Sequence, residues 1–527
     1  MSEGAEADAR MTDPLTAFTS TGPLQGQWAD ADETIGVFKG IPYAAPPVGE
    51  LRWRPPQPPR PWTQPRQAYK FGHACWQDGE RTSFVWMRGP FQYGEDCLYL
   101  NVWNQPRSQK KLPVMVWFHG GAHTSGFGHS EIFDGTALAE KDVLLVSINY
   151  RLGPWGFLAH PMLTAESDHA SSGNYGLLDK IAALTWVKNN IEGFGGDPDN
   201  VTIFGQSAGS SSVCALMTAP MARGLFHKAI GQSAACLNKF KHDSSGEARG
   251  QALIANALAR TGISAPAIVA QMRALDNASL LAAVSATHWA EQSRIVVDGW
   301  MLERPPLEIF AASEQARVPL LLGSMANEGI ELLPMQADLS TAEFDAQLNQ
   351  RFAQHALAIK AAYAVELAKS PGLAQRQINA DLYMALSMRD WAGYQSQLGA
   401  PTYLYFMDYV PPALALYRPP QPRLDLPGGP RSVGAYHSGD LAFVFNNVGR
   451  FAADDNLWTQ DDALLADSMS TYWTNFAKYG NPNGANLPHW PAYETKYHST
   501  QNLNLPIRSI NGAIPDKLAC LSAAVSQ

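Results

Sequence analysis

The segment VTIFGQSAGS (residues 201–210) decides the fold, because it places a glycine-flanked serine between an apolar strand and a helix. Its first four residues are apolar or β-branched, as a short buried strand requires. Residues 205–209 then read Gly-x-Ser-x-Gly, and the residues up to Pro220 predict a helix. A chain of this length and glycine content contains the five-residue pattern by chance roughly once in four or five cases, so the neighbouring sequence has to support it.

The residues before this segment predict a β-α-β unit. Residues 174–193 repeat apolar side chains at intervals of three and four, which is typical of an amphipathic helix that ends at Gly193. The tetrapeptide DPDN (197–200) predicts a turn into the next strand. Further apolar runs of strand length lie at 97–103, 112–120, 142–150, 227–235, 318–325 and 401–410. Because the run at 112–120 and that at 142–150 are apolar nearly throughout, we expect an α/β fold with a mostly parallel sheet.

The chain of 527 residues has no internal repeat and no low-complexity linker, so we expect one α/β domain over residues 1–527. Helix-rich insertions are expected around 240–315 and 335–400, and they could form a cap beside the sheet. The proline-rich stretch 40–62 predicts irregular coil at the surface, because proline fixes φ and lacks the N–H that a central strand donates. Other helices are predicted at 246–262, 373–396 and 461–478.

Charge and composition exclude several classes of protein. The net charge of −9 argues against a nucleic-acid partner, which favours a basic surface. No run of about 18 apolar residues is present, so we expect no membrane anchor. The opening residues, MSEGAEADAR, lack the basic and apolar regions of a signal peptide, which predicts a cytoplasmic protein unless an export signal is missing from the sequence. Without an HExxH, P-loop or dinucleotide-binding motif, neither a metal nor a cofactor is expected.

Ser207 is the candidate nucleophile. A strand, a tight turn and a helix form a nucleophile elbow, in which flanking glycines remove Cβ atoms that would clash. A serine hydroxyl also needs a base, and N–H donors where the carbonyl oxygen becomes negative. The small residues of HGGAH (119–123) follow an apolar strand. We therefore predict an oxyanion hole from the backbone N–H groups of Gly121, Ala122 and Ala208, the alternative being an ordinary glycine turn.

The sequence as a whole resembles the type-B carboxylesterases, the family that includes the cholinesterases. The segments that carry the resemblance are FKGIPYAAPPVGELRW (38–53), EDCLYLNVW (95–103), HGGA (119–122), NYRLGPWGFL (149–158), the stretch 173–210 and NFAKYGNPN (475–483). They extend over most of the chain. The resemblance implies the α/β-hydrolase fold, with a central sheet flanked by helices, and hydrolysis of carboxylic esters by a serine mechanism.

Two further residues complete a predicted catalytic triad. The partners in α/β-hydrolases follow the order serine, acid, histidine along the chain. Glu328 stands just beyond the C-terminal end of a predicted strand, where open α/β sheets place functional groups, and it matches the acid of the family. His437, in GAYHSGD (434–440), matches the histidine. We expect His437 to be the base for Ser207, and Glu328 to hold the imidazole.

Three residues depart from the family pattern. Gln206 precedes Ser207, where cholinesterases have glutamate, and we predict it as a substrate-pocket residue. Its neutral side chain makes a preference for choline esters less expected. His123 stands where an aromatic residue commonly follows the oxyanion-hole residues. It is either a ring-for-ring replacement or a polar group of the substrate pocket. Asp440 stands where relatives often have glutamate, and we do not expect it to be the triad acid.

Two tryptophans and two cysteines complete the candidate residues. Trp86 lies in an aromatic-rich loop that either lines an apolar gorge mouth or packs against itself at the surface. Trp300 is either a pocket wall or a core residue. The five cysteines are too few for a disulfide scaffold and are expected as small buried side chains, although the resemblance pairs Cys75 with Cys97.

The function with the most support is a cofactor-free serine hydrolase that cleaves small-molecule esters, as a monomer or weak homo-oligomer. The same triad would serve a specialised amidase, a carbamate hydrolase or a detoxifying esterase for a bulky ester. Non-catalytic adhesion members of the superfamily generally lack one or more triad residues. Ser207, Glu328 and His437 are all present, which argues against that alternative.

Overall fold

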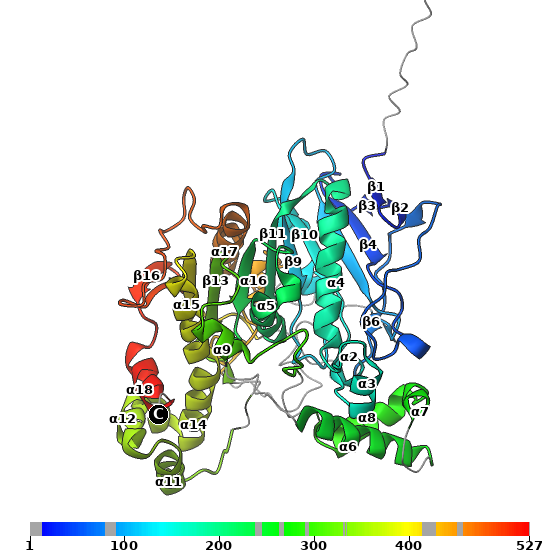
Figure 1. Cartoon of the computed structure of the whole chain (residues 1–527). Helices are drawn as coiled ribbons and strands as arrows, with labels where there is room; N and C mark the ends of the chain where they lie inside the picture. Colours follow the sequence, from blue (N-terminus) through cyan, green and yellow to red (C-terminus); the bar gives the residue numbers. More distant parts are fainter. Residues whose placement is uncertain are drawn as a thin grey trace, which may run out of the picture.

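The computed structural model of the protein describes residues 13–78, 91–237, 245–262, 268–289, 295–329, 333, 335–413, 428–450 and 457–525. An 11-stranded sheet forms the centre of this part of the chain (Figure 1). In spatial order its strands are β16 (Arg508–Asn511), β15 (Ser499–Leu503), β14 (Thr402–Met407), β13 (Leu320–Met325), β12 (Lys228–Gln232), β11 (Gly196–Gln206), β9 (Leu112–Phe118), β10 (Leu144–Ile148), β8 (Tyr99–Asn104), β4 (Gly36–Pro42) and β3 (Gln27–Trp28). Smaller sheets contain β1 (Thr16–Thr19), β2 (Gly22–Gln25) and β5 (Arg66–Gln67), and β6 (Ala74–Cys75) and β7 (Tyr93–Gly94).

The sheet is parallel in its middle and antiparallel at its edges. The strands from β10 through β9 and β11 to β15 all pair in parallel. β8, β4 and β3 add antiparallel pairs at one edge, and β16 adds one at the other. The predicted α/β fold with a mostly parallel sheet is therefore confirmed.

The alternation of side chains along β9 explains why its sequence is apolar throughout. Val114, Val116 and Phe118 belong to the core on one face of the sheet, whereas Met115 and Trp117 belong to the core on the other. All five side chains are fully buried. A strand covered by helices on both faces has no position at which a polar side chain would reach water.

The helices cover both faces of the sheet (Figure 1). Residues of α4 and α5 contribute to the core that contains Val116, and residues of α16 and α17 to the core that contains Trp117. The helices are α1 (Thr136–Ala139), α2 (Gly153–Phe157), α3 (Pro161–Glu166), α4 (Tyr175–Asn190), α5 (Ala208–Thr218), α6 (Ser245–Arg260), α7 (Val269–Arg273), α8 (Asn277–Ala286), α9 (Pro306–Ala311), α11 (Thr341–Phe352), α12 (Ala356–Ala362), α13 (Ala364–Lys369), α14 (Pro371–Ala380), α15 (Leu386–Gln397), α16 (Leu441–Val444), α17 (Gln460–Tyr479) and α18 (Pro515–Val525).

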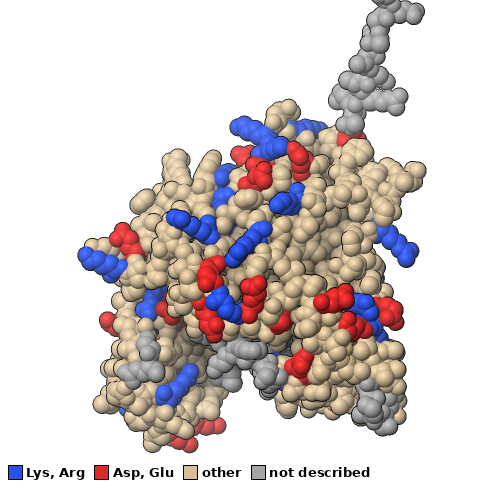
Figure 2. Space-filling view, viewed as in Figure 1, with Lys and Arg blue, Asp and Glu red and all other residues tan. Residues whose placement is uncertain are grey.

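Two groups of helices lie at the lower end of the sheet in Figure 1, on opposite sides. One contains α6, α7 and α8, and the other contains α11, α12, α14 and α18. The helices α6, α7 and α8 lie within residues 240–315, and α11, α12 and α14 lie within residues 335–400. The helix α18, near the C-terminus, packs on the second group through Leu518 and Leu521. Figure 2 shows the surface indented between the groups, with acidic and basic side chains interspersed on the face in view.

The local predictions were wrong at two places. The predicted turn DPDN lies inside β11, where the register against β9 shifts between Gly196 and Val201. The first residues of the predicted coil 40–62 end the strand β4. A strand is allowed there because its one proline, Pro42, is the last residue, at the end of the β4–β8 pairing. The helix predicted at 373–396 corresponds to α14 and α15, joined by a π-helical turn at Asp381–Ala385.

Candidate active site

Ser207 lies at a sharp turn between β11 and α5. Its backbone has φ of 56° and ψ of −123°, a conformation that costs an L-residue about 1–3 kcal/mol. The turn is held by the Ser207 N–H, which donates to the carbonyl of Gln232 on β12. A Cβ at Gly209 would lie 1.9 Å from the carbonyl oxygen of Phe118, so only glycine lets α5 approach the end of β9 this closely. The strained serine and its glycine are the geometry of a nucleophile elbow.

The loop after β9 lies directly against this elbow. A Cβ at Gly120 would lie 3.2 Å from the Cβ of Ser207. Gly121 and Ala122 both have positive φ, at 98° and 55°, so consecutive residues of the loop are left-handed. Among the described residues, no side chain or backbone carbonyl accepts the N–H of Gly121, Ala122 or Ala208. The loop and the first turn of α5 therefore leave three backbone donors beside Ser207.

His119 supports this loop from the core side, a role that the sequence analysis did not assign. Its ring is fully buried and stacks on the ring of Tyr150, with centroids 4.3 Å apart. Its Nδ1–H donates to the carbonyl of Gly120, and the Tyr150 hydroxyl donates to the carbonyl of His119. Burial lowers the pKa of His119 to about 3, so this ring is neutral. A neutral, doubly anchored ring fixes the loop without adding charge to the site.

Glu328 and His437 form a buried hydrogen-bonded pair. His437 Nδ1–H donates to Glu328 Oε2 over 2.5 Å, and both side chains are almost fully shielded from solvent. The second carboxylate oxygen of Glu328 accepts the backbone N–H of Met325 over 2.8 Å. Because both oxygens are held, the carboxylate fixes the plane of the imidazole and turns Nε2, the other ring nitrogen, away from Glu328.

Asn327 brings these two distant loops together. Its backbone N–H donates to the carbonyl of Ala435, and its side-chain oxygen accepts the N–H of Ala435, each over 2.9 Å. Asn327 and Tyr436 form an isolated parallel bridge, so the segment before His437 is paired with the segment before Glu328. Asn327 was not among the predicted site residues, although its position next to Glu328 in the sequence is a signal for it.

Gln206 occupies the space between His437 and the loop after β9. Its side chain is fully buried, and its Nε2 lies 3.0 Å from Nε2 of His437. Gln206 is the last residue of β11, so this contact places Nε2 of His437 next to the residue that precedes Ser207. Gln206, a predicted substrate-pocket residue, lies against the predicted base.

Asp440 lies within electrostatic reach of His437 but bonds to other groups. Its Oδ2 accepts hydrogen bonds from Gln232 Nε2 over 2.8 Å and from the Tyr405 hydroxyl over 3.1 Å. Burial, with a contribution from the charge of Glu328, raises the pKa of Asp440 to about 6. Of the two acidic residues considered in the sequence, Glu328 is the one that bonds His437.

His123 points away from the loop surface and into the core. Its side chain is buried, its ring packs on Phe157, and its Nε2 lies 3.0 Å from Ser212 Oγ. Ser212 Oγ in turn donates to the carbonyl of Ala208 over 2.9 Å, so the histidine nitrogen is the donor to Ser212. His123 thus links the loop after β9 to α5, which favours the interpretation as a ring replacement over that of a polar pocket group.

Replacing His123 by phenylalanine keeps the ring and removes this hydrogen bond. We expect the free energy of unfolding to fall by about 1 kcal/mol, the net value of one such bond. Relative kcat/KM values across esters of different acyl and alcohol size should stay within about twofold, because the ring is buried against Phe157. Urea unfolding and an ester panel measure both effects. A changed ranking of substrates would indicate that His123 is a polar group of the substrate pocket.

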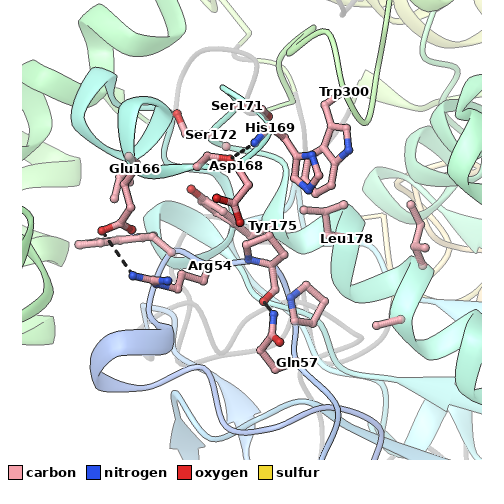
Figure 3. Close-up of a pocket in the computed structure, with 18 of the residues that line it drawn as sticks. Arg54, Gln57, Glu166, Asp168, His169, Ser171, Ser172, Tyr175, Leu178 and Trp300 are labelled. Carbon is pink, nitrogen blue, oxygen red and sulfur yellow. Dashed lines mark hydrogen bonds and ion pairs between the residues drawn. The ribbon is translucent and has the colours of Figure 1, made fainter.

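Of the two tryptophans predicted as possible pocket residues, the structure describes only Trp300. Trp86 lies outside the described residues. Trp300 lines a cavity of about 420 Å³, shown in Figure 3, whose wall also includes Arg54, Asp168 and Tyr175. The ring of Trp300 stacks on His169 with centroids 3.8 Å apart. No residue of the predicted triad or oxyanion hole lines this cavity, so the structure does not bring Trp300 together with Ser207.

Four of the five cysteines form disulfides. Cys75 pairs with Cys97, and Cys214 pairs with Cys236. The expectation of an unpaired buried side chain was therefore wrong for Cys214 and Cys236. Cys214 lies on α5 and Cys236 follows β12, so this bond ties the helix that begins after Ser207 to the neighbouring strand. Nothing in the spacing of the two cysteines indicated that they would meet.

The mostly parallel sheet and the strained serine at the end of β11 define an α/β-hydrolase. The sequence model of the carboxylesterase family matches residues 13–516. This protein belongs to the carboxylesterase family and is a carboxylic ester hydrolase.

Similar proteins include curated enzymes and solved structures. Fumonisin B1 esterase of Sphingopyxis macrogoltabida is 35% identical over 511 residues, which cover 93% of this chain and 86% of that protein. Para-nitrobenzyl esterase of Bacillus subtilis is 34% identical, with 95% and 96% covered. The crystal structure of a carboxylesterase of Geobacillus stearothermophilus is 32% identical, with a TM-score of 0.81 and 96% and 100% covered. These similarities extend over nearly the whole chain, as a shared fold requires.

Proposed function

We propose that this ester hydrolase uses Ser207 as nucleophile, His437 as general base and acid, and Glu328 as the group that orients His437. The observation that carries the proposal is the placement of the buried His437 ring. One nitrogen donates to Glu328, and the other faces the residue directly before Ser207. A ring held in this way could take the proton of Ser207, whose hydroxyl is nearly inert at neutral pH without a base.

The reaction follows from this arrangement. Ser207 Oγ attacks the ester carbonyl carbon while its proton passes to His437 Nε2. The carbonyl oxygen becomes negative and accepts hydrogen bonds from the N–H groups of Gly121, Ala122 and Ala208, each worth about 2.7–4 kcal/mol in the transition state. The ester C–O bond then breaks, and the alcohol leaves with the proton from His437. Water, deprotonated by His437, attacks the acyl-enzyme, and the carboxylic acid is released as Ser207 regains its proton.

The alternatives differ in their support. A non-catalytic adhesion role is not favoured, because the described residues hold an oriented histidine beside a strained serine. An amidase or carbamate hydrolase would use the same residues, and that choice stays a prediction. Ester panels that vary acyl length and alcohol bulk would identify the substrate class.

The proposal also concerns the compartment in which the protein works and its oligomeric state. Within the described residues, no helix is both long and apolar enough to cross a membrane. Two disulfides favour an oxidising compartment over the cytoplasm, because cytosolic thiols are kept reduced. We therefore favour an oxidising compartment. The predicted monomer or weak homo-oligomer would be tested by sedimentation of the purified protein.

A fluorophosphonate probe, which phosphorylates activated serines, tests the proposed nucleophile. We expect stoichiometric labelling of the peptide that contains Ser207, found by mass spectrometry, and a parallel loss of hydrolysis of a para-nitrophenyl ester. Protein unfolded in urea should not react, because the hydroxyl is then no longer activated. Ester hydrolysis that persists after complete labelling of Ser207 would contradict the proposal.

A further inference from the structure

The amide of Gln206 makes one hydrogen bond that the reaction must break. Its Nε2 lies 3.0 Å from His437 Nε2, and its Oε1 is buried with no hydrogen-bond partner among the described residues. The oxygen points toward the loop after β9, since a Cβ at Gly120 would lie 2.8 Å from it. The side chain therefore reaches from the base to the predicted oxyanion loop.

The protons carried by His437 and by the amide of Gln206 determine which of the two donates in this hydrogen bond. Nδ1 of His437 carries the proton that Glu328 accepts, so in the neutral ring Nε2 has a lone pair and no hydrogen. The amide nitrogen of Gln206 has two N–H groups and must be the donor. Imidazole has only one lone pair at Nε2. Gln206 and the hydroxyl of Ser207 therefore compete for the same acceptor in the free enzyme.

When His437 is protonated, its Nε2 needs an acceptor from Gln206 instead of a donor. In the imidazolium, both ring nitrogens are donors, and the amide N–H groups of Gln206 would face another N–H. A half-turn about the Cγ–Cδ bond of Gln206 exchanges its nitrogen with its oxygen and supplies an acceptor. The oxygen has no bond that the turn would break, and Gly120 has no side chain to obstruct the exchanged nitrogen.

We propose that Gln206 is a positioning residue for this reaction: its amide caps the neutral His437 in the free enzyme, and in the tetrahedral intermediate its oxygen turns toward the imidazolium. The single Nε2–H is then shared between this oxygen and the leaving oxygen, until the alcohol departs with the proton. The inference rests on the proposed triad and adds a step to it. Gln206 does not touch the reacting carbonyl in this scheme. It acts through the base, by offering a donor to one protonation state and an acceptor to the other.

The charges around His437 explain why an amide suits this position. Glu328 and Asp440 both face the ring, and the Tyr405 hydroxyl is bonded to Asp440. Asp440 is itself held mainly in its protonated form below about pH 6 by burial. A carboxylate at position 206 would add a third buried acid beside these two, and it could accept from the imidazolium but never donate to the neutral ring.

The test compares Gln206→Glu with Gln206→Met. The glutamate favours protonated His437, so the acidic limb of the kcat/KM profile against pH should move up by about one unit. The methionine offers neither donor nor acceptor. We expect it to lower kcat on the alkaline plateau about tenfold while KM changes less than twofold, because the missing acceptor is needed only once His437 is charged. Thermal unfolding checks that both variants are folded.

Gln395 provides a matched control. Its side chain is also fully buried, and its amide donates to the carbonyls of Ala316 and Val318, before β13. Gln395→Met should lower the melting temperature and leave the pH limb in place. An unchanged kcat in Gln206→Met would overturn the inference, even if Gln206→Glu fails to fold. If Ser207→Ala also retained turnover, the proposed triad itself would be wrong, so the two failures are distinguishable.

Discussion

Replacing Ser207 by alanine is expected to lower kcat/KM for ester substrates by about 10⁵-fold without unfolding the protein. The substitution removes the oxygen of the proposed nucleophile, while the buried contacts around the elbow stay in place. His437 and the predicted oxyanion donors would remain, so a small residual rate from water attack is expected. Initial rates with a para-nitrophenyl ester, followed by single-turnover detection of the acyl-enzyme, measure the loss. Turnover within tenfold of the wild type would refute the mechanism.

Glycine at the same position is the informative control. Ser207→Gly should be equally inactive, but it should be more stable than Ser207→Ala by about 1 kcal/mol. The reason is that φ of 56° with ψ of −123° strains alanine and serine, whereas glycine adopts it readily. Urea unfolding of the two inactive variants isolates this difference. Equal stability would show that the turn is not strained in solution.

The second large effect is expected for Glu328→Gln, with a loss in kcat of about 10³–10⁴-fold. The two carboxylate oxygens accept from two different donors, His437 Nδ1–H and the N–H of Met325. Glutamine has a single oxygen, so its NH₂ group must face one of these donors, and the imidazole loses its fixed orientation or its tautomer. Steady-state kinetics above the acidic limb of the pH profile measure the effect.

Asp440→Asn is the comparison that separates the two acids. Its Oδ2 serves both Gln232 and Tyr405, and an asparagine oxygen can still do so. We therefore expect a loss in kcat of no more than about tenfold. A loss in kcat as large as that of Glu328→Gln would indicate that Asp440 is part of the catalytic machinery. It would contradict the expectation that Asp440 is not the triad acid.

The stability of Asp440→Asn should depend on pH in a defined window. Burial raises the pKa of Asp440 from 3.8 to about 6 in the folded protein. A carboxyl with a raised pKa favours folding while protonated, and this contribution is lost as pH rises from 3.8 through about 6. Asparagine does not titrate. The stability of the variant relative to wild type should rise between about pH 4 and pH 6, then level off, as urea unfolding at several pH values would show.

Much of the fold was predictable because it depends on local chemistry. Strands β8 to β14 were anticipated because a strand covered on both faces must be apolar along its length, as β9 is. β15 was missed because its sequence, STQNL, is mostly polar although every residue is buried. Its place in the sheet is set by pairing with β14, and pairing with a strand about a hundred residues away leaves no periodic signal.

Part of the candidate site was likewise predictable from the sequence, and part of it was not. The serine, acid and histidine could be named in order from their flanking residues. The contacts that make them a site could not, since Asn327 joins the loop of Glu328 to that of His437 across a distance of 108 residues. His123 was ambiguous in the sequence, because the residues next to it do not determine whether its ring turns inward or outward. Packing against Phe157 and the bond to Ser212 selected the inward direction.

The sequence by itself determined that β11 ends in a sharp turn at Ser207, because glycine spacing and apolar runs act on neighbouring residues through sterics and burial. Only the tertiary structure decided that Gln206 would meet His437, 231 residues away, and that Cys214 would meet Cys236. Such contacts depend on how the sheet and its loops close on one another. The two groups of each contact lie in different segments of the chain, so no short segment of the sequence predicts the contact.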